Sequence, residues 1–229
     1  MGRYATIDDL RAEGIDDDGR VESVLIPLAE AAIERWTGFR FYSYAATLVL
    51  DGTGTRVLVL PQAILSITSV TVDTVAVDAG DYVVYNRRPP GRDDRRWPRL
   101  ARPPSLDSWN AQAGGAIWAV GAQNVSVVGT FGFTDADAQG NERPPEEIRR
   151  LTLRLVALEL ARLGDLDELT ARRLRVYGLS MDAGGVSLSL AAAAVSDGPT
   201  GVPEIDGIVA RYSHVGLGAR PRVAFGGAR

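Results

Sequence analysis

Apolar residues recur at intervals of three or four positions over residues 1–44, which predicts helices there. Thr6, which is followed by acidic residues, is typical of a helix N-cap. Pro27 lies within the second helical pattern, so that helix either begins at this proline or bends there. Gly38 marks its C-terminal end. The apolar positions of this second helix are Val21, Val24, Leu25, Leu28, Ala32 and Trp36.

Between residues 45 and 135 the apolar spacing changes to every second position, which is typical of β-strands. Residues 47–50 and 56–60 flank the turn-forming segment 51–54, and this arrangement predicts a β-hairpin. Six or seven short strands of this kind form a small antiparallel sheet or sandwich. Further strands are predicted at 67–72, 75–77, 82–85, 116–120 and 124–133, the last with Val125, Val127, Phe131 and Phe133 on one face.

Residues 144–177 return to a helical pattern, which begins with two prolines and two glutamates. Its apolar residues cover so much of the circumference that we expect burial on more than one side, in a bundle or against a neighbouring subunit. A break at Gly164 separates a shorter, arginine-rich helix at about 166–177.

These patterns predict an α+β fold in which a small antiparallel β-domain is inserted into a helical bundle. The N-terminal helices occupy 1–44, the β insert 45–135 and the C-terminal helices of the bundle 144–177. An extended C-terminal arm, 178–229, contains a short predicted helix at 203–212.

Composition narrows the chemistry that this fold can carry. The 229 residues include no Cys and a single His, His214, which excludes thiolate chemistry and a multi-histidine metal site within one chain. No apolar run approaches the roughly 20 residues that span a bilayer, and the N-terminus lacks an apolar signal core. Composition therefore predicts a soluble, unsecreted protein that is poorly supplied with catalytic side chains. We expect no membrane partner and no cofactor, and we favour a role that is not enzymatic.

Residues 135–146 partly match a calcium-binding loop, with oxygen ligands at alternate positions and Gly140 at the sixth. Arg143 at the ninth position and the two prolines that follow depart from that pattern. The alternative is a solvated strand-to-helix turn whose aspartates form local hydrogen bonds. The residues of this weak match are Asp135, Asp137, Gln139 and Glu146.

All 25 basic residues are arginine, and seven of them lie within residues 87–102 although the net charge is −4. This segment belongs to a long loop predicted at 86–115. Its guanidinium groups could contact DNA phosphates or form salt bridges with an acidic neighbouring subunit. We favour the salt bridges with a neighbouring subunit. Neutralising Arg95, Arg96 and Arg99 should then weaken assembly. The candidate residues of the loop are Arg87, Arg88, Arg92, Arg95, Arg96, Trp97, Arg99 and Arg102.

The order of the elements resembles the head–tail connector (adaptor) proteins of tailed phages and related gene transfer agents. The resemblance covers roughly residues 6–163. It rests on a helix that ends in Ile-Glu-Arg-Trp-Thr-Gly-Phe-Arg, and on four later phrases in a fixed order. These phrases are Leu-Pro-Gln-Ala-Ile-Leu-Ser-Ile-Thr-Ser-Val-Thr-Val-Asp at 60–73, Asp-Tyr-Val-Val-Tyr-Asn at 81–86, Val-Ser-Val-Val-Gly-Thr-Phe-Gly-Phe-Thr at 125–134 and Pro-Pro-Glu-Glu-Ile at 144–148.

The resemblance implies a structural subunit of the virion, assembled in the bacterial host cytoplasm as a ring that commonly has twelve copies. Such a ring lies between the portal protein and the tail-completion or stopper proteins, and it extends the channel for the packaged DNA. By analogy the C-terminal segment 204–229 is the portal-binding arm, unless it has no fixed structure. The portal-binding candidates are Ile205, Ile208, Tyr212, Arg220, Arg222, Val223 and Phe225.

Two other classes remain open from the sequence. One is a carboxylate-dependent hydrolase, because 29 acidic residues allow paired carboxylates although none is marked as such. The other is a monomeric binding module that uses its β-sheet face.

Overall fold

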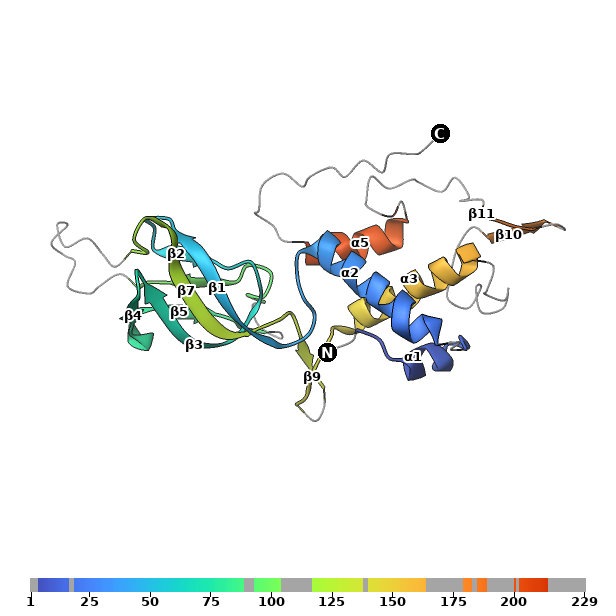
Figure 1. Ribbon diagram of the computed structural model, residues 1–229, viewed down its shortest axis with the longest axis horizontal. Helices are drawn as coiled ribbons and strands as arrows, with labels where there is room; N and C mark the ends of the chain where they lie inside the picture. Colours follow the sequence, from blue (N-terminus) through green and yellow to red (C-terminus); the bar gives the residue numbers. More distant parts are fainter. Residues whose placement is uncertain are drawn as a thin grey trace, which may run out of the picture.

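The computed structural model describes residues 4–16, 19–88, 93–103, 117–137, 140–163, 179–182, 185–188, 200 and 202–213. Helices gather at one end of the elongated molecule, and a β part occupies the other end (Figure 1). The helical end contains α1 (Ile7–Ala12), the π-helical turn η1 (Val21–Leu25), α2 (Ile26–Thr37), α3 (Glu146–Leu163) and α5 (Pro203–Tyr212).

The β part consists of two antiparallel sheets. The first has the order β1 (Tyr44–Gly52), β7 (Gly121–Phe131), β3 (Ile64–Val72) and β4 (Val75–Val77). The second has the order β2 (Val57–Val59), β6 (Arg99–Ala101) and β5 (Val83–Tyr85), and the 3-10 turn η2 (Ala79–Asp81) precedes β5. Outside these sheets, β8 (Asp135–Ala136) pairs with β9 (Glu142–Arg143), and β10 (Leu179–Asp182) pairs with β11 (Gly185–Leu188).

The N-terminal helices begin where the local chemistry favours a helix start. The Thr6 hydroxyl accepts a hydrogen bond from the Asp9 amide, and the Asp9 carboxylate accepts one from the Thr6 amide, which forms a capping box for α1. Pro27 lacks an amide to donate to the preceding turn, and the wider π turn of η1 lies immediately before it. Pro27 therefore occupies the first turn of α2, and Gly38 ends that helix in a left-handed conformation.

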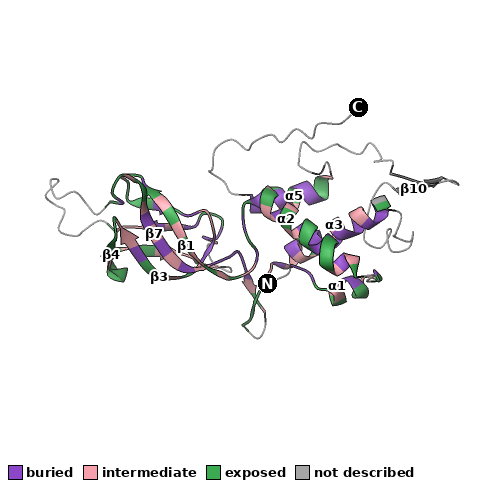
Figure 2. Ribbon diagram, viewed as in Figure 1, coloured by how far each residue is buried: buried purple, intermediate pink, exposed green. Residues whose placement is uncertain are grey.

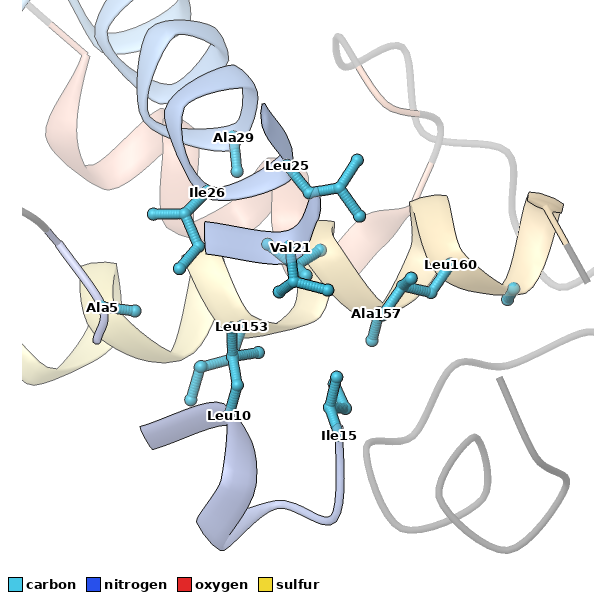
Figure 3. Close-up of a cluster of buried hydrophobic side chains, with 12 residues drawn as sticks. Ala5, Leu10, Ile15, Val21, Leu25, Ile26, Ala29, Leu153, Ala157 and Leu160 are labelled. Atoms are coloured by element: carbon cyan, nitrogen blue, oxygen red, sulfur yellow. The ribbon is translucent and has the colours of Figure 1, made fainter. Parts of the chain in front are cut away.

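The helical core is formed by α1, η1, α2 and α3. Leu10 and Ile15 approach Leu153 and Ala157 of α3, while side chains of η1 and α2 close the cluster from the other side (Figure 3). Burial of Leu155 and Leu158 against both this core and a second one confirms the expectation that α3 is covered on more than one side.

The β part has its own hydrophobic core, in which Trp118 is completely buried beside residues of β2, β3, β6 and β7. The hairpin predicted between 47–50 and 56–60 is wrong, because β1 pairs with β7 and β2 pairs with β6. The intervening segment is held elsewhere: the Gly54 amide donates to the Trp118 carbonyl at 2.8 Å, and the Trp118 amide donates to the Thr55 carbonyl at 2.9 Å. These bonds also use the predicted strand at 116–120, whose described residues form no strand.

The predicted fold class is also wrong. The chain is a mixed α and β protein in which helices make up only a minority of the described residues, and the β part is not a small insert in a helical bundle. The physical reason is that the two antiparallel sheets enclose a core of nine buried residues of their own, comparable in size with each of the two cores lined by helices. The helix predicted at about 166–177 lies outside the described residues, whereas α5 confirms the one predicted at 203–212.

An aromatic junction joins the helical end to the β part. We use this name for the buried rings of Tyr4, Phe39, Phe41, Phe133 and Tyr212. The centroids of Phe133 and Tyr212 are 5.2 Å apart, and those of Phe41 and Tyr212 are 5.5 Å apart. The ring of Phe131 packs in the β core, but β7 ends at this residue and Phe133 beyond it turns into the junction. The prediction that Phe131 and Phe133 share one face is therefore wrong.

Candidate interaction surfaces

The arginine-rich segment folds back onto its own chain, and Arg95 holds it there. Arg95 is only 5% exposed. Its guanidinium group donates to both carboxylate oxygens of Asp93, to Asp135 Oδ1 at 2.5 Å and to the Thr134 carbonyl at 2.7 Å. It also lies 4.3 Å from the centroid of the Phe133 ring. Arg95 thereby links this segment to the aromatic junction and to the segment that follows β7.

The charges of this cluster stabilise one another. Burial disfavours the charged form of Asp93, but the hydrogen bonds and positive charge of Arg95 more than offset it, so the pKa of Asp93 lies below its ordinary value. Burial likewise opposes the charge of Arg95, yet the carboxylates of Asp93 and Asp135 raise its pKa. Both groups are therefore ionised at neutral pH, as a structural ion pair requires.

Most other arginines of the segment also have partners within the chain. Arg87 donates to Asp94 Oδ2 at 2.7 Å, and Arg88 donates to Glu142 at 3.1 Å. Arg99 lies 3.9 Å above the ring of Tyr85, and Arg102 lies 4.8 Å from the ring of Trp118. Through these contacts the arginines bind groups of their own chain. The hypothesis from the sequence had paired the arginines with a neighbouring subunit.

Arg87, Arg96 and Trp97 are the candidates among the described residues of this segment whose side chains remain exposed, Arg87 although it pairs with Asp94. The Arg96 guanidinium lies over the ring of Tyr212 of the helical end, at 5.6 Å from its centroid. Arg92 lies outside the described residues, so its prediction stays untested.

The portal-binding candidates on α5 have an internal role. Ile205 and Tyr212 are buried in the core around the aromatic junction, and Ile208 is partly buried against it. Burial and then the nearby Glu147 raise the pKa of Tyr212 to about 12, so its hydroxyl keeps its proton. Arg220, Arg222, Val223 and Phe225, as well as His214, lie outside the described residues.

The segment compared with a calcium loop forms local contacts. Asp135 accepts from Arg95, while the Asp137 carboxylate accepts from the Asn141 amide at 2.8 Å and from its side chain at 3.0 Å. Glu146 accepts from Arg149 and Arg150, and Gln139 lies outside the described part. Over the residues that the structure describes, no group of three or more His, Asp or Glu side chains is placed to hold a metal ion.

The ion pairs of Glu146 should make the free energy of unfolding depend on pH in the acid range. Hydrogen bonds from Arg149 lower its pKa to about 2, against some loss of hydration. A lowered pKa in the folded state contributes stability above the ordinary pKa of 4.5, and this contribution is lost as pH falls toward 2. Glu146→Gln should therefore cost about 1 kcal/mol at pH 7, as for a partly exposed ion pair, and the difference from the wild type should shrink below pH 4.

Urea denaturation at pH 7, 4 and 2.5 measures this difference. Asp81→Asn, a change at an exposed carboxylate of the β part, serves as the control and should behave as the wild type throughout. A Glu146→Gln deficit that stays constant from pH 7 to pH 2.5 would contradict the assignment.

An apolar stripe along η1 and the start of α2 faces away from the protein core. Val24 and Leu28, two of the apolar positions that recur at helical spacing, are 45% and 59% exposed. Pro27 and Ala31 are exposed beside them, and neighbours three and four positions apart share one face of a helix. We call Val24, Pro27, Leu28 and Ala31 the α2 stripe; exposed residues along α2 can be followed in Figure 2.

A second exposed apolar surface lies on the three-stranded sheet. Val57 of β2 and Val83 of β5 both pair with Ala101 of β6, so the three side chains form a row across the sheet. Val57 is 39% exposed and Val83 is 48% exposed. The next row on this side consists of Val59, Arg99 and Tyr85, whereas Leu58 and Leu100 point into the β core. We call these two rows the outer sheet face.

The sequence patterns missed both surfaces for an understandable reason. A helix with apolar residues on more than one side can have either side exposed, and alternation along a strand does not say which face is covered. One feature of the sequence could have revealed the exposed face of α2. This helix carries more apolar positions than one buried face requires.

A scan of the chain against protein-family models finds no match, and a search of characterised proteins finds no similar sequence. None of the helices in the described ranges combines the length and the apolar character needed to cross a membrane.

Proposed function

We propose that this chain is a structural subunit of the head–tail connector of a tailed phage-like particle, without a catalytic role. It assembles into a ring that binds the portal protein on one side and tail-completion or stopper proteins on the other. The packaged DNA passes through the channel of this ring. The order of sequence elements described above is the basis for choosing this class of protein.

The α2 stripe is the structural observation that supports a subunit role. The opposite side of α2 is already buried through Ile26, Ala29 and Ile33. A helix that is apolar on two sides is suited to lie between its own fold and a neighbouring molecule. Subunits that associate head to tail through such surfaces form rings when the rotation between them closes.

Light scattering and electron microscopy test this proposal. The wild-type chain, alone or mixed with purified portal rings, should form closed rings, while Leu28→Glu should elute as a 24.5 kDa monomer because its carboxylate places a charge in the apolar contact. Glu22→Gln, a change on the side of η1 that faces away from the stripe, should leave assembly intact. A wild-type chain that remains monomeric at every concentration, both alone and with portal rings, would overturn the proposal.

A chain shortened after Ser213 separates ring formation from portal binding. The predicted portal-binding arm includes Arg220, Arg222, Val223 and Phe225, so its removal should abolish co-sedimentation with portal rings and leave the stripe intact. Portal binding that survives this deletion would contradict the assignment of the arm.

A further inference from the structure

Two arginines lie opposite each other at one end of the three-stranded sheet. The Arg102 amide donates to the Arg56 carbonyl at 2.9 Å, which continues the pairing of β6 with β2 by one further residue pair. Side chains alternate along a strand, so both arginines point to the side of the sheet that Leu58 and Leu100 occupy. That side faces the β core, and the two arginines therefore lie at the edge of this core.

The Arg102 side chain packs against the end of the β core. Its guanidinium group lies 4.8 Å from the centroid of the Trp118 ring, which is completely buried. The Trp118 indole donates to the Arg56 carbonyl at 3.1 Å, so the ring is fixed beside the same two strands. Arg102 Nε is buried and has no hydrogen-bond partner among the residues that the structure describes. A buried donor without an acceptor costs free energy, and an acceptor from outside the chain would remove this cost.

The positive charges of this pair are not neutralised within the described part of the chain. Four arginines between residues 87 and 99 form ion pairs with carboxylates. No such pair involves Arg56 or Arg102 in the described ranges, although the two residues face each other across the strands. Opposite residues of paired strands have Cβ atoms about 5 Å apart, and like charges at that spacing destabilise a sheet. A bound anion would offset this repulsion.

The geometry of guanidinium groups indicates which anion fits. Nε and Nη present their donors as a planar fork that matches two oxygens of one oxyanion, and in Arg102 the Nε side of this fork is unused. A carboxylate matches one fork, whereas the tetrahedral oxygens of a phosphate group can accept from two guanidinium groups at once. We propose that Arg56 and Arg102 form a phosphate-binding site at this end of the β part. Free phosphate and the phosphates of DNA share this chemistry, and the site does not depend on the proposed ring.

NMR titration of the full chain with inorganic phosphate tests the site. Phosphate should shift the Arg102 Nε–H signal, and sodium acetate at the same ionic strength should not. Arg56→Met should weaken the binding of phosphate about tenfold, because it removes a charged donor. Arg35→Met, which removes an exposed arginine from α2 at the helical end, is the matched control and should bind phosphate as the wild type does. Arg102→Lys keeps the charge without the fork, so it should bind more weakly than the wild type.

A fluorescently labelled DNA duplex identifies the source of the phosphate. If the site binds the DNA backbone, the salt dependence of log K measured by anisotropy should be less steep by about one unit in Arg56→Met. Binding of inorganic phosphate without binding of DNA would assign the site to a free phosphate compound. Both results support a phosphate-binding site.

Three results would overturn the inference. They are the absence of phosphate binding, equal binding of acetate and phosphate, and an affinity for phosphate that Arg56→Met lowers no more than Arg35→Met does. Arg56 is exposed, so its substitution should leave the fold intact, which circular dichroism checks. The test therefore remains decisive even if substitutions of the packed Arg102 disturb folding.

Discussion

Replacing Arg95 with methionine is expected to lower the free energy of unfolding by about 3 kcal/mol. Methionine fills a similar volume but its side chain donates no hydrogen bond, so Asp135 and the Thr134 carbonyl lose the guanidinium donor, and Asp93 loses it too but keeps the backbone amide of residue 95. The cost is at the lower end for a broken buried ion pair, because both carboxylates are partly exposed and can recover water. Urea denaturation followed by circular dichroism measures the change.

Arg96→Met is the matched control, because the neighbouring arginine is exposed and its guanidinium lies over the Tyr212 ring at 5.6 Å from the centroid. It should change the free energy of unfolding by less than about 1 kcal/mol. Equal effects of the two substitutions would show that Arg95 does not hold the segment. The comparison also bears on assembly: a loss of rings after neutralising Arg95 reflects folding, whereas Arg96 reports on contacts between subunits.

Gly132→Ala is expected to destabilise the protein by about 3 kcal/mol or more. Gly132 has a φ of +142°, a conformation that residues with a Cβ rarely adopt. A Cβ there would lie 2.1 Å from the Tyr42 carbonyl oxygen, which is a backbone atom that cannot rotate away. The backbone would have to shift between β7 and the aromatic junction, and denaturant midpoints should report the loss.

Gly207→Ala makes the same chemical change with the opposite expected sign. Gly207 lies inside α5, and a Cβ there would meet nothing within 4 Å. Alanine is the better helix former, so the variant should gain about 0.5–1 kcal/mol. If Gly132→Ala were as well tolerated as Gly207→Ala, the close approach between Gly132 and Tyr42 would not exist in solution.

The sequence predicted the local elements better than their partners. Thr6 as a cap, the end of α2 at Gly38 and the helix at 203–212 follow from short-range chemistry that neighbouring residues determine. The prediction of a hairpin around 51–54 was wrong because distant strands compete with the nearest strand for each pairing. β7 and the segment around Trp118 offered better partners than the nearest strand did, and no local pattern reveals that competition.

For the candidate surfaces too, the sequence showed local features but not the distant residues that contact them. A cluster of seven arginines was visible in the sequence, but their partners Asp135 and Glu142 lie some 40 and 54 residues away along the chain. The exposure of Val24 and Leu28 was not visible, because helical spacing alone does not distinguish the side that faces α3 from the side that faces solvent.

The aromatic junction has a mechanical consequence. The rings of Tyr4, Phe41, Phe133 and Tyr212 interlock residues from the N-terminus, from both sides of the β part and from α5, and Arg95 fastens a further segment to them. These ring contacts couple the helical end to the β part, so we expect the described part of the molecule to move as one stiff body. A small tilt imposed on the helical end displaces the far edge of the β part by a proportionally larger distance, and successive copies in an assembly must reorient as whole bodies.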